Sequence, residues 1–198
     1  MADGPQLALL VLDTGPLITL AAADSLDYLL LPGLPVSIPD AVFYEATQDS
    51  ARLGAQAILE WVQARGEAVR VLPTEAFANF LALLALRPGH RERDLGERAA
   101  LEALRDVMPL AAVGRALLVT EDDRVLRQGG WHADEPGAPV MLTTRDFLLA
   151  CEDERRINST DEVYRRAEDA GRLASRRQAA QRSHEEAMAA LRAVPRRP

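Results

Sequence analysis

The most constraining feature of this chain is a short apolar run that ends at an aspartate. Residues 6–12 read QLALLVL, and Asp13-Thr-Gly-Pro follows directly. An apolar run of this length that does not alternate with polar residues is typical of a strand buried on both faces, as in parallel sheets. Pro16 then favours the start of a helix, because proline is tolerated in the first helical turn. The segment therefore predicts a buried strand, a helix after it, and a carboxylate at the junction.

The rest of the chain repeats this alternation. Further apolar segments predict strands at 36–38, 68–72, 116–120 and 139–142. Helical patterns cover about 16–23, 24–31, 51–65, 74–87, 94–107 and 144–150, with further helix starts at Asp40 and Ser159. Strands that alternate with helices predict an α/β fold with a mainly parallel central sheet. The 198 residues fit one such domain over 1–150 and a helical C-terminal extension over 151–198.

Four acidic residues occur where the ends of such strands and the starts of nearby helices are expected: Asp13, Glu45, Glu97 and Asp122. If the first and fourth strands are neighbours, Asp13 and Asp122 face each other at the carboxyl edge of the sheet, where open α/β sheets bind ligands. Converging carboxylates repel one another, and a hard divalent cation such as Mg²⁺ or Mn²⁺ removes that conflict. We therefore expect these four acids to be the metal ligands and catalytic residues.

Two of these acids also have a structural interpretation. Asp13 can cap the helix after the first strand, through Thr14 and Gly15, and this role is compatible with metal binding. Asp94-Leu-Gly-Glu97 has the spacing of a capping box. If Glu97 only caps its helix, Asp94 is the acid expected to face the metal.

The doublet after the fourth strand leaves a second choice open. Asp122 and Asp123 compete for one ligand position, and the hydroxyl of Thr120 could either contact a ligand water or phosphate or simply end the strand. Four carboxylates can hold one or two ions. A bound metal ion would acidify water for attack on phosphorus, and a second ion would stabilise the leaving oxygen.

Four segments in this order resemble the signature segments of PIN-domain nucleases, a family that includes the toxin ribonucleases of bacterial toxin–antitoxin pairs. They are LVLDTGPLI, IPDAVFYEAT, DLGERAALEAL and LLVTEDDRV, and the resemblance covers roughly residues 7–146. It implies a compact three-layer α/β/α domain, Mg²⁺ or Mn²⁺, and metal-dependent cleavage of RNA. In this family's pattern Asp13, Glu45, Glu97 and Asp122 match the acidic set, with Asp122 favoured over Asp123.

The resemblance leads us to expect an RNA substrate, a small antitoxin protein as partner, and a homodimer. The alternative is a catalytically weak PIN-like protein that binds RNA or a partner. A phosphoacceptor of the response-regulator kind also places acids at strand ends, but it needs a lysine, and the chain has none. The net charge of −7 argues against broad electrostatic attraction to nucleic acid.

Other classes lack their motifs. The chain contains no Walker loop, no G-x-G-x-x-G, no H-E-x-x-H and no paired C-x-x-C, which argues against nucleotide hydrolysis, dehydrogenase and zinc functions. A single cysteine, Cys151, cannot form an internal disulfide and is expected to be a buried apolar residue rather than a nucleophile. The N-terminal MADGPQ lacks a basic region, and no apolar run is long enough to span a membrane, so we expect a cytoplasmic protein.

Overall fold

The structure is a computed structural model that describes residues 8–11, 13–110, 116–121, 140–174 and 176. Its centre is a five-stranded sheet in the order β3-β2-β1-β4-β5 in which every pair of neighbours is parallel. The strands are β1 (Ala8–Val11), β2 (Val36–Pro39), β3 (Val69–Leu72), β4 (Ala116–Val119) and β5 (Val140–Leu142). The predicted α/β class and the parallel pairing are therefore confirmed.

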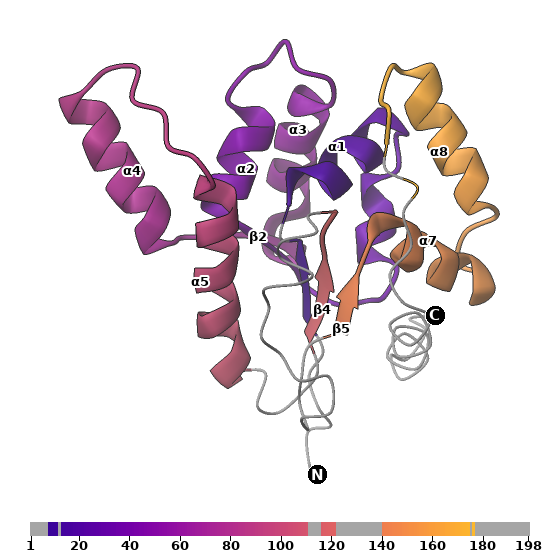
Figure 1. Cartoon of the computed structure of the whole chain (residues 1–198). Helices are drawn as coiled ribbons and strands as arrows, with labels where there is room; N and C mark the ends of the chain where they lie inside the picture. The colour runs from indigo at the N-terminus through magenta and orange to yellow at the C-terminus, as the bar shows by residue number, and fades with distance from the viewer. Residues whose placement is uncertain (1–7, 12, 111–115, 122–139, 175, 177–198) are drawn as a thin grey trace.

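Helices connect and cover these strands, as Figure 1 shows. They are α1 (Thr14–Ala22), α2 (Asp40–Thr47), α3 (Ala55–Arg65), α4 (Glu75–Leu86), α5 (Leu95–Leu110), α7 (Thr144–Asp153) and α8 (Thr160–Asp169). Two short 3-10 segments, η1 (Leu26–Leu30) and η2 (Gly66–Ala68), complete the described elements. The segment predicted as a helix over 24–31 is thus a 3-10 turn, because Pro32 and Gly33 leave it too short to extend.

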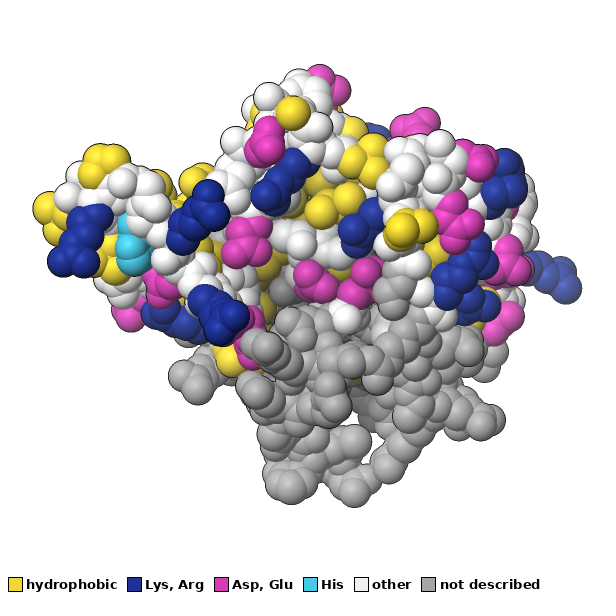
Figure 2. Space-filling model, turned by 45° about the horizontal axis from the view of Figure 1, so that its top comes forward, with side chains coloured by type: hydrophobic (Ala, Val, Ile, Leu, Met, Phe, Trp, Pro, Cys, Tyr) yellow, Lys and Arg dark blue, Asp and Glu magenta, His cyan; other side chains and the backbone are white. Residues whose placement is uncertain are grey.

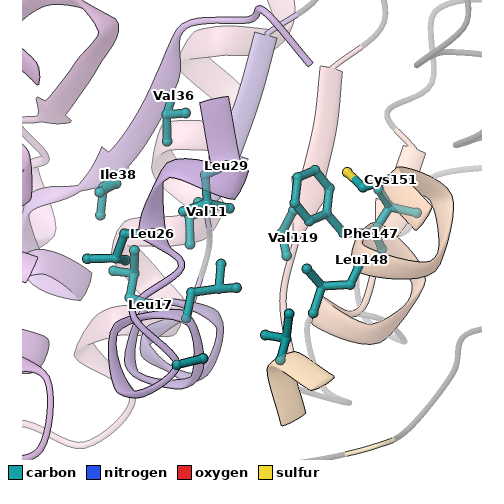
Figure 3. Close-up of a cluster of buried hydrophobic side chains, with 14 of the residues drawn as sticks. Val11, Leu17, Leu26, Leu29, Val36, Ile38, Val119, Phe147, Leu148 and Cys151 are labelled. Carbon is teal, nitrogen blue, oxygen red and sulfur yellow. The ribbon is translucent and has the colours of Figure 1, made fainter. Parts of the chain in front are cut away.

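The sheet buries side chains on both of its faces. On β4, Leu117 and Val119 belong to the main apolar cluster with α1, α7 and α8, whereas Leu118 packs with Ala100 and Leu104 of α5 on the other face. Figure 3 shows part of the main cluster, in which β-strand residues meet Leu17 of α1 and residues of α7. Burial on both faces explains why the strands are continuous apolar runs.

One lobe lies apart from the sheet. Figure 1 shows α4 at the edge of the molecule, and its contacts are with α5 and α2. Phe80 of α4 is buried there with Ala41 of α2 and Leu95 of α5. This small cluster sets the distance between α2 and the loop that joins α4 to α5.

The segment after residue 150 is part of the same packing. Helix α7 crosses the boundary predicted between residues 150 and 151. Val163, Tyr164 and Ala167 of α8 are at most 1% exposed and belong to the main cluster, against α1. Helical periodicity predicts a stripe of Val163, Ala167, Ala170 and Leu173. Only the first two are buried, because α8 ends at Asp169 and the last two are exposed, and Tyr164 is buried beside them.

Cys151 is buried in the main cluster, in agreement with its expected apolar role. Burial raises the pKa of its thiol to about 12, so the thiolate that nucleophilic chemistry needs is not formed near neutral pH. No helix in the described part of the chain combines the length and the apolarity needed to cross a membrane.

Candidate metal site

The order of the strands places the switch point of the sheet between β1 and β4. The chain runs from β1 to β2 and β3 on one side, and then returns to β4 on the other side of β1 and continues to β5. The carboxyl ends of β1 and β4 therefore border a crevice, and open α/β sheets bind their ligands at this position. Asp13 follows β1, and Glu121 follows β4 after one buried threonine.

The carboxylate of Asp13 is bound by backbone groups from both sides of this crevice. Its Oδ1 accepts a hydrogen bond from the Gly15 N–H at 3.1 Å, which is the cap of α1. Its Oδ2 accepts a hydrogen bond from the Glu121 N–H at 3.0 Å. The capping role predicted for Asp13 is confirmed. The Thr14 hydroxyl also donates to Oδ1, at 3.5 Å, whereas Oδ2 accepts only the Glu121 N–H among the described groups, so a lone pair of Oδ2 is compatible with a metal ligand.

Glu121 is the acid that the sequence did not point to. Its Oε1 accepts a hydrogen bond from the Thr144 hydroxyl at 2.6 Å, and its side chain is 10% exposed. Burial raises the pKa of Glu121, and the nearby Asp13 carboxylate raises it further, whereas the Thr144 hydrogen bond and Arg172 lower it. Glu121 is thus a buried acid that shares the electrostatic field of Asp13.

Space for these two carboxylates depends on Gly15. A Cβ atom on Gly15 would lie 2.6 Å from Glu121 Oε2 and 3.2 Å from Asp13 Oδ2. Real Cβ atoms essentially never approach another heavy atom as closely as the first distance. The glycine of the Asp-Thr-Gly-Pro segment therefore allows two carboxylate oxygens to occupy the same side of the first turn of α1.

Glu45 approaches the same region from α2. The Gly96 N–H, at the start of α5, donates a hydrogen bond to its carboxylate, and a Cβ on Gly96 would lie 2.9 Å from Glu45 Oε2. Burial raises the pKa of Glu45 and the Asp13 carboxylate raises it further, while the Gly96 hydrogen bond and Arg52 lower it. A second glycine thus makes room for a second acid, which is half-buried, at a helix N-terminus that favours negative charge.

The other predicted residues have defined places in the chain. Glu97 is half-buried in the first turn of α5, directly after Gly96. Asp94 precedes that helix with a φ of 58°, which is not the extended conformation usual for a capping-box residue. Thr14 begins α1, and Thr120 is fully buried at the end of β4. The choice between Glu97 and Asp94 as the acid that faces a metal stays a prediction.

Asp122 and Asp123, predicted as alternatives for one ligand position, lie outside the described residues. Glu121, which directly precedes the doublet, lies beside Asp13 at the carboxyl edge of the sheet. The structure brings Asp13 and Glu121 together beside Gly15, and Glu45 is near enough for the Asp13 carboxylate to raise its pKa.

The segment beyond residue 150 contributes a cation to this region. Arg172 follows α8, and one guanidinium nitrogen lies 3.7 Å from Glu121 Oε2. Its Nε donates to the hydroxyl of buried Thr19 at 3.4 Å. Gly171, with a φ of 91°, ends α8 and lets the Arg172 N–H donate to the Ala167 carbonyl. The residues that follow α8 are thereby directed toward Glu121.

The donor chemistry of the site fits a hard divalent cation. The converging groups are carboxylate and hydroxyl oxygens, the ligands that Mg²⁺ and Mn²⁺ prefer. Within the residues that the structure describes, however, no three acidic, histidine or cysteine side chains are already close enough to enclose an ion. Figure 2 shows acidic side chains near the middle of the face that is turned forward, with basic side chains on both sides.

A cavity in the described part of the chain lies away from these acids. It has a volume of about 740 Å³ and is lined by residues such as Leu34, Arg70 and Arg156, near the amino ends of β2 and β3. It contains none of the predicted acids. The position of the acids at the strand crossover, rather than cavity size, therefore identifies the candidate site.

Comparisons with known proteins leave this site to be judged on its geometry. The chain matches no protein-family model, and no curated protein matches it.

Proposed function

We propose that this protein is a divalent-metal-dependent ribonuclease with a PIN-like three-layer domain, and that it acts as a toxin-like component with a small antitoxin protein as partner. The observation that supports this proposal most directly is the hydrogen bond from the Glu121 N–H to Asp13 Oδ2, which holds the ends of β1 and β4 together beside the space left by Gly15. Asp13 and Glu121 lie together at the switch point of a parallel sheet, and Glu45 is near enough for the Asp13 carboxylate to raise its pKa, so a cation bound there would relieve repulsion between carboxylates.

The chain's own residues have separate tasks in this proposal. Asp13 and Glu45 are the described acids that would hold Mg²⁺ or Mn²⁺, and Glu97 and Asp122 stay predicted members of the set. Glu121 adds negative charge and is oriented by Thr144. When bound, the metal supplies Lewis acidity toward the phosphodiester and toward the attacking water. Gly15 and Gly96 leave the space that the carboxylates need.

The first experiment asks whether the site binds a metal. Thermal melts are recorded with EDTA, with millimolar Mn²⁺ and with Ca²⁺. A ligand that binds only the folded form at a hundredfold excess over its Kd stabilises it by about 2.7 kcal/mol. We expect Mn²⁺ to raise the melting temperature, and Asp13→Asn to abolish that rise. A melting temperature that does not change with Mn²⁺ would contradict the proposed metal site.

The second experiment asks whether the site cleaves RNA. A mixed single-stranded RNA is incubated with Mn²⁺ or Mg²⁺ and the protein, or with its Asp13→Asn or Glu45→Gln variant. Each variant should cut at least about 100-fold more slowly, since loss of residues that merely orient a metal ligand already costs 10–100-fold. Matched controls are Asp169→Asn and Glu60→Gln, which alter exposed acids on α8 and α3.

The alternative function is that of a PIN-like protein that binds RNA or a partner without cutting RNA. The pairing of Glu121 with Arg172 favours it, because this carboxylate already has a cation beside it. RNA binding that survives EDTA, together with an absence of metal-dependent cleavage, would support this alternative. Growth arrest on expression, lost in Asp13→Asn, would support the toxin-like role.

A further inference from the structure

A second hollow adjoins the candidate metal site on the side of α2. It has a volume of about 520 Å³ and lies between α2, α4 and the loop that joins α4 to α5. Glu45 belongs both to this cavity and to the acidic set. The volume lies within the range of about 300–1,000 Å³ that small ligands occupy. Whatever binds in this cavity is therefore next to the proposed reaction centre.

We propose that this cavity holds one unpaired nucleotide of an RNA strand, beside the phosphodiester at the acidic site. The inference rests on the proposed ribonuclease function and names the part of the substrate that this function leaves unspecified. Its support comes from three features of the cavity wall: aromatic rings, neutralised acids, and one uncompensated arginine.

Aromatic rings form one side of the cavity. The rings of Tyr44 and Phe80 have centroids 5.9 Å apart, and the ring of His90 lies 6.0 Å from Phe80 on the loop side. Tyr44 and His90 are partly exposed, while Phe80 is buried beneath them. Bases of single-stranded nucleic acid stack on rings of this kind, because every base presents a π face.

His90 adds an unused polar atom to this wall. Its Nε2 is buried and has no hydrogen-bond partner among the residues that the structure describes. A buried polar atom without a partner is unfavourable. A base edge carries both donors and acceptors, so a bound base that reached this imidazole would remove the deficit.

The charges around the cavity leave one arginine for a phosphate. Asp49 pairs with Arg52 at 3.8 Å, and Glu92 pairs with Arg98. Arg91 lines the cavity, is exposed, and has no ion-pair partner among the described residues. A guanidinium binds the phosphate oxygens of a nucleotide through two parallel hydrogen bonds. Two of the cavity's acids are thus already neutralised, and Arg91 is available to the RNA backbone.

The test measures binding rather than cleavage. The probes are single-stranded RNA tetranucleotides and matched tetranucleotides that lack one base, and the absence of Mg²⁺ and Mn²⁺ keeps them uncut. Binding is followed by fluorescence anisotropy in EDTA and in Ca²⁺. We expect the removal of one base to weaken binding about tenfold, as the loss of one base–aromatic stack does.

Arg91 and Arg93 form a matched pair of variants. Both are exposed residues of the same loop, but only Arg91 lines the cavity. Arg91→Gln should weaken binding and reduce the slope of log K against log salt by about 0.7, the value for one phosphate contact with a single strand. Arg93→Gln should leave both quantities unchanged. Equal losses for the two variants would overturn the proposal, since they would indicate general electrostatic attraction.

Tyr44→Leu tests the aromatic wall separately. It should reduce the difference between complete and base-lacking tetranucleotides, and melts recorded in parallel confirm that the variant is folded. If the variant does not fold, the comparison of Arg91→Gln with Arg93→Gln still decides the matter. An unchanged preference for the complete tetranucleotide in a folded Tyr44→Leu variant would contradict the cavity as the base site.

The two proposals fail independently. If binding depends on the base and on Arg91 but no metal-dependent cleavage is found, the proposal for the cavity stands and the proposed nuclease function is contradicted. The opposite outcome is metal-dependent cleavage that Asp13→Asn abolishes and Arg91→Gln leaves unaltered, with equal binding of both probe types. It would support the nuclease function and contradict the proposal for the cavity.

Discussion

The Glu121 N–H donates a hydrogen bond to Asp13 Oδ2 at 3.0 Å across 108 positions of sequence. The other oxygen of the same carboxylate accepts from the Gly15 N–H at 3.1 Å. One side chain therefore joins the end of β4 to the end of β1 and to the start of α1. This double acceptance makes Asp13 a structural residue as well as the leading candidate for a metal ligand.

The first prediction concerns the stability of Asp13→Asn without metal. An amide has one acceptor oxygen, so one of the two N–H groups loses its partner, which costs roughly 1–3 kcal/mol of the unfolding free energy. Relief of repulsion with Glu45 and Glu121 offsets part of this cost. We expect a lower melting temperature in EDTA than for Asp169→Asn. An equal or higher one would mean that repulsion outweighs the hydrogen bond.

Glu45→Gln should change how stability depends on pH. Burial and Asp13 raise the pKa of Glu45 above its ordinary value of 4.5, while the Gly96 N–H and Arg52 oppose this effect. Its stabilising contribution is therefore complete below the unfolded pKa and is lost as the pH rises through the folded pKa. In EDTA, the variant should gain more melting temperature over the wild type at about pH 7.5 than at about pH 4. A gain that is identical at both values, or equalled by Glu60→Gln, would contradict the shift.

Gly96→Ala should separate metal affinity from folding. The added Cβ would lie 2.9 Å from Glu45 Oε2, so the carboxylate must move, but its flexible end can do so at little cost to the fold. Alanine is the better helix former by up to about 1 kcal/mol, which supports α5. We expect a stability equal to or above that of the wild type and Mn²⁺ binding weakened about tenfold by calorimetry. Unchanged Mn²⁺ affinity would exclude Glu45 as a ligand.

Arg172→Met should destabilise the metal-free protein. Glu121, at 10% exposure, would lose its nearby cation, and Thr19 would lose the donor from Nε. The expected cost is roughly 1–2 kcal/mol, because the pair is long and the arginine is partly exposed. Denaturant unfolding measures it, with Arg165→Met as control. Arg165 is 59% exposed, and such surface pairs contribute at most about 1 kcal/mol. Equal losses of unfolding free energy in the two variants would show that the Glu121–Arg172 pair contributes no more stability than an exposed ion pair.

Tyr164→Ala should show whether α8 is part of the core. Tyr164 is fully buried against the main cluster, and truncating a buried aromatic residue to alanine costs about 3–5 kcal/mol. Denaturant unfolding should show this loss, whereas Arg165→Ala, at the next and exposed position, should have little effect. A stability unchanged by Tyr164→Ala would mean that α8 detaches without affecting the domain.

The elements of this fold could be predicted because each segment carries its own local signal. The apolar runs gave the strands, and their lack of alternation gave the parallel pairing with burial on both faces. Strand order could not be predicted, since the pairing of β1 with β4 depends on packing between distant segments. Tyr164 was missed because one aromatic residue in a charged helix does not reveal which face it occupies.

The site could be predicted only in part, because some of its residues have a local sequence signal and others do not. Asp13 stands at a strand end with its own capping signal, so its place follows from the sequence. Glu121 does not: it directly precedes the Asp122-Asp123 doublet, and only the Thr144 hydroxyl and the Gly15 gap show that it turns inward. A glycine whose missing Cβ leaves room for a carboxylate is a tertiary feature, and the sequence alone contains no measure of that distance.

The placement of β4 between β1 and β5 also has a consequence for synthesis on the ribosome. Synthesis begins at the N-terminus, so the N-terminal segments of the chain are released first. A growing chain that has released β1, β2 and β3 holds Asp13 at an open sheet edge and lacks the Glu121 amide that binds it. Arg172 emerges later still. The acidic cluster is therefore completed only after both of these later segments have left the ribosome.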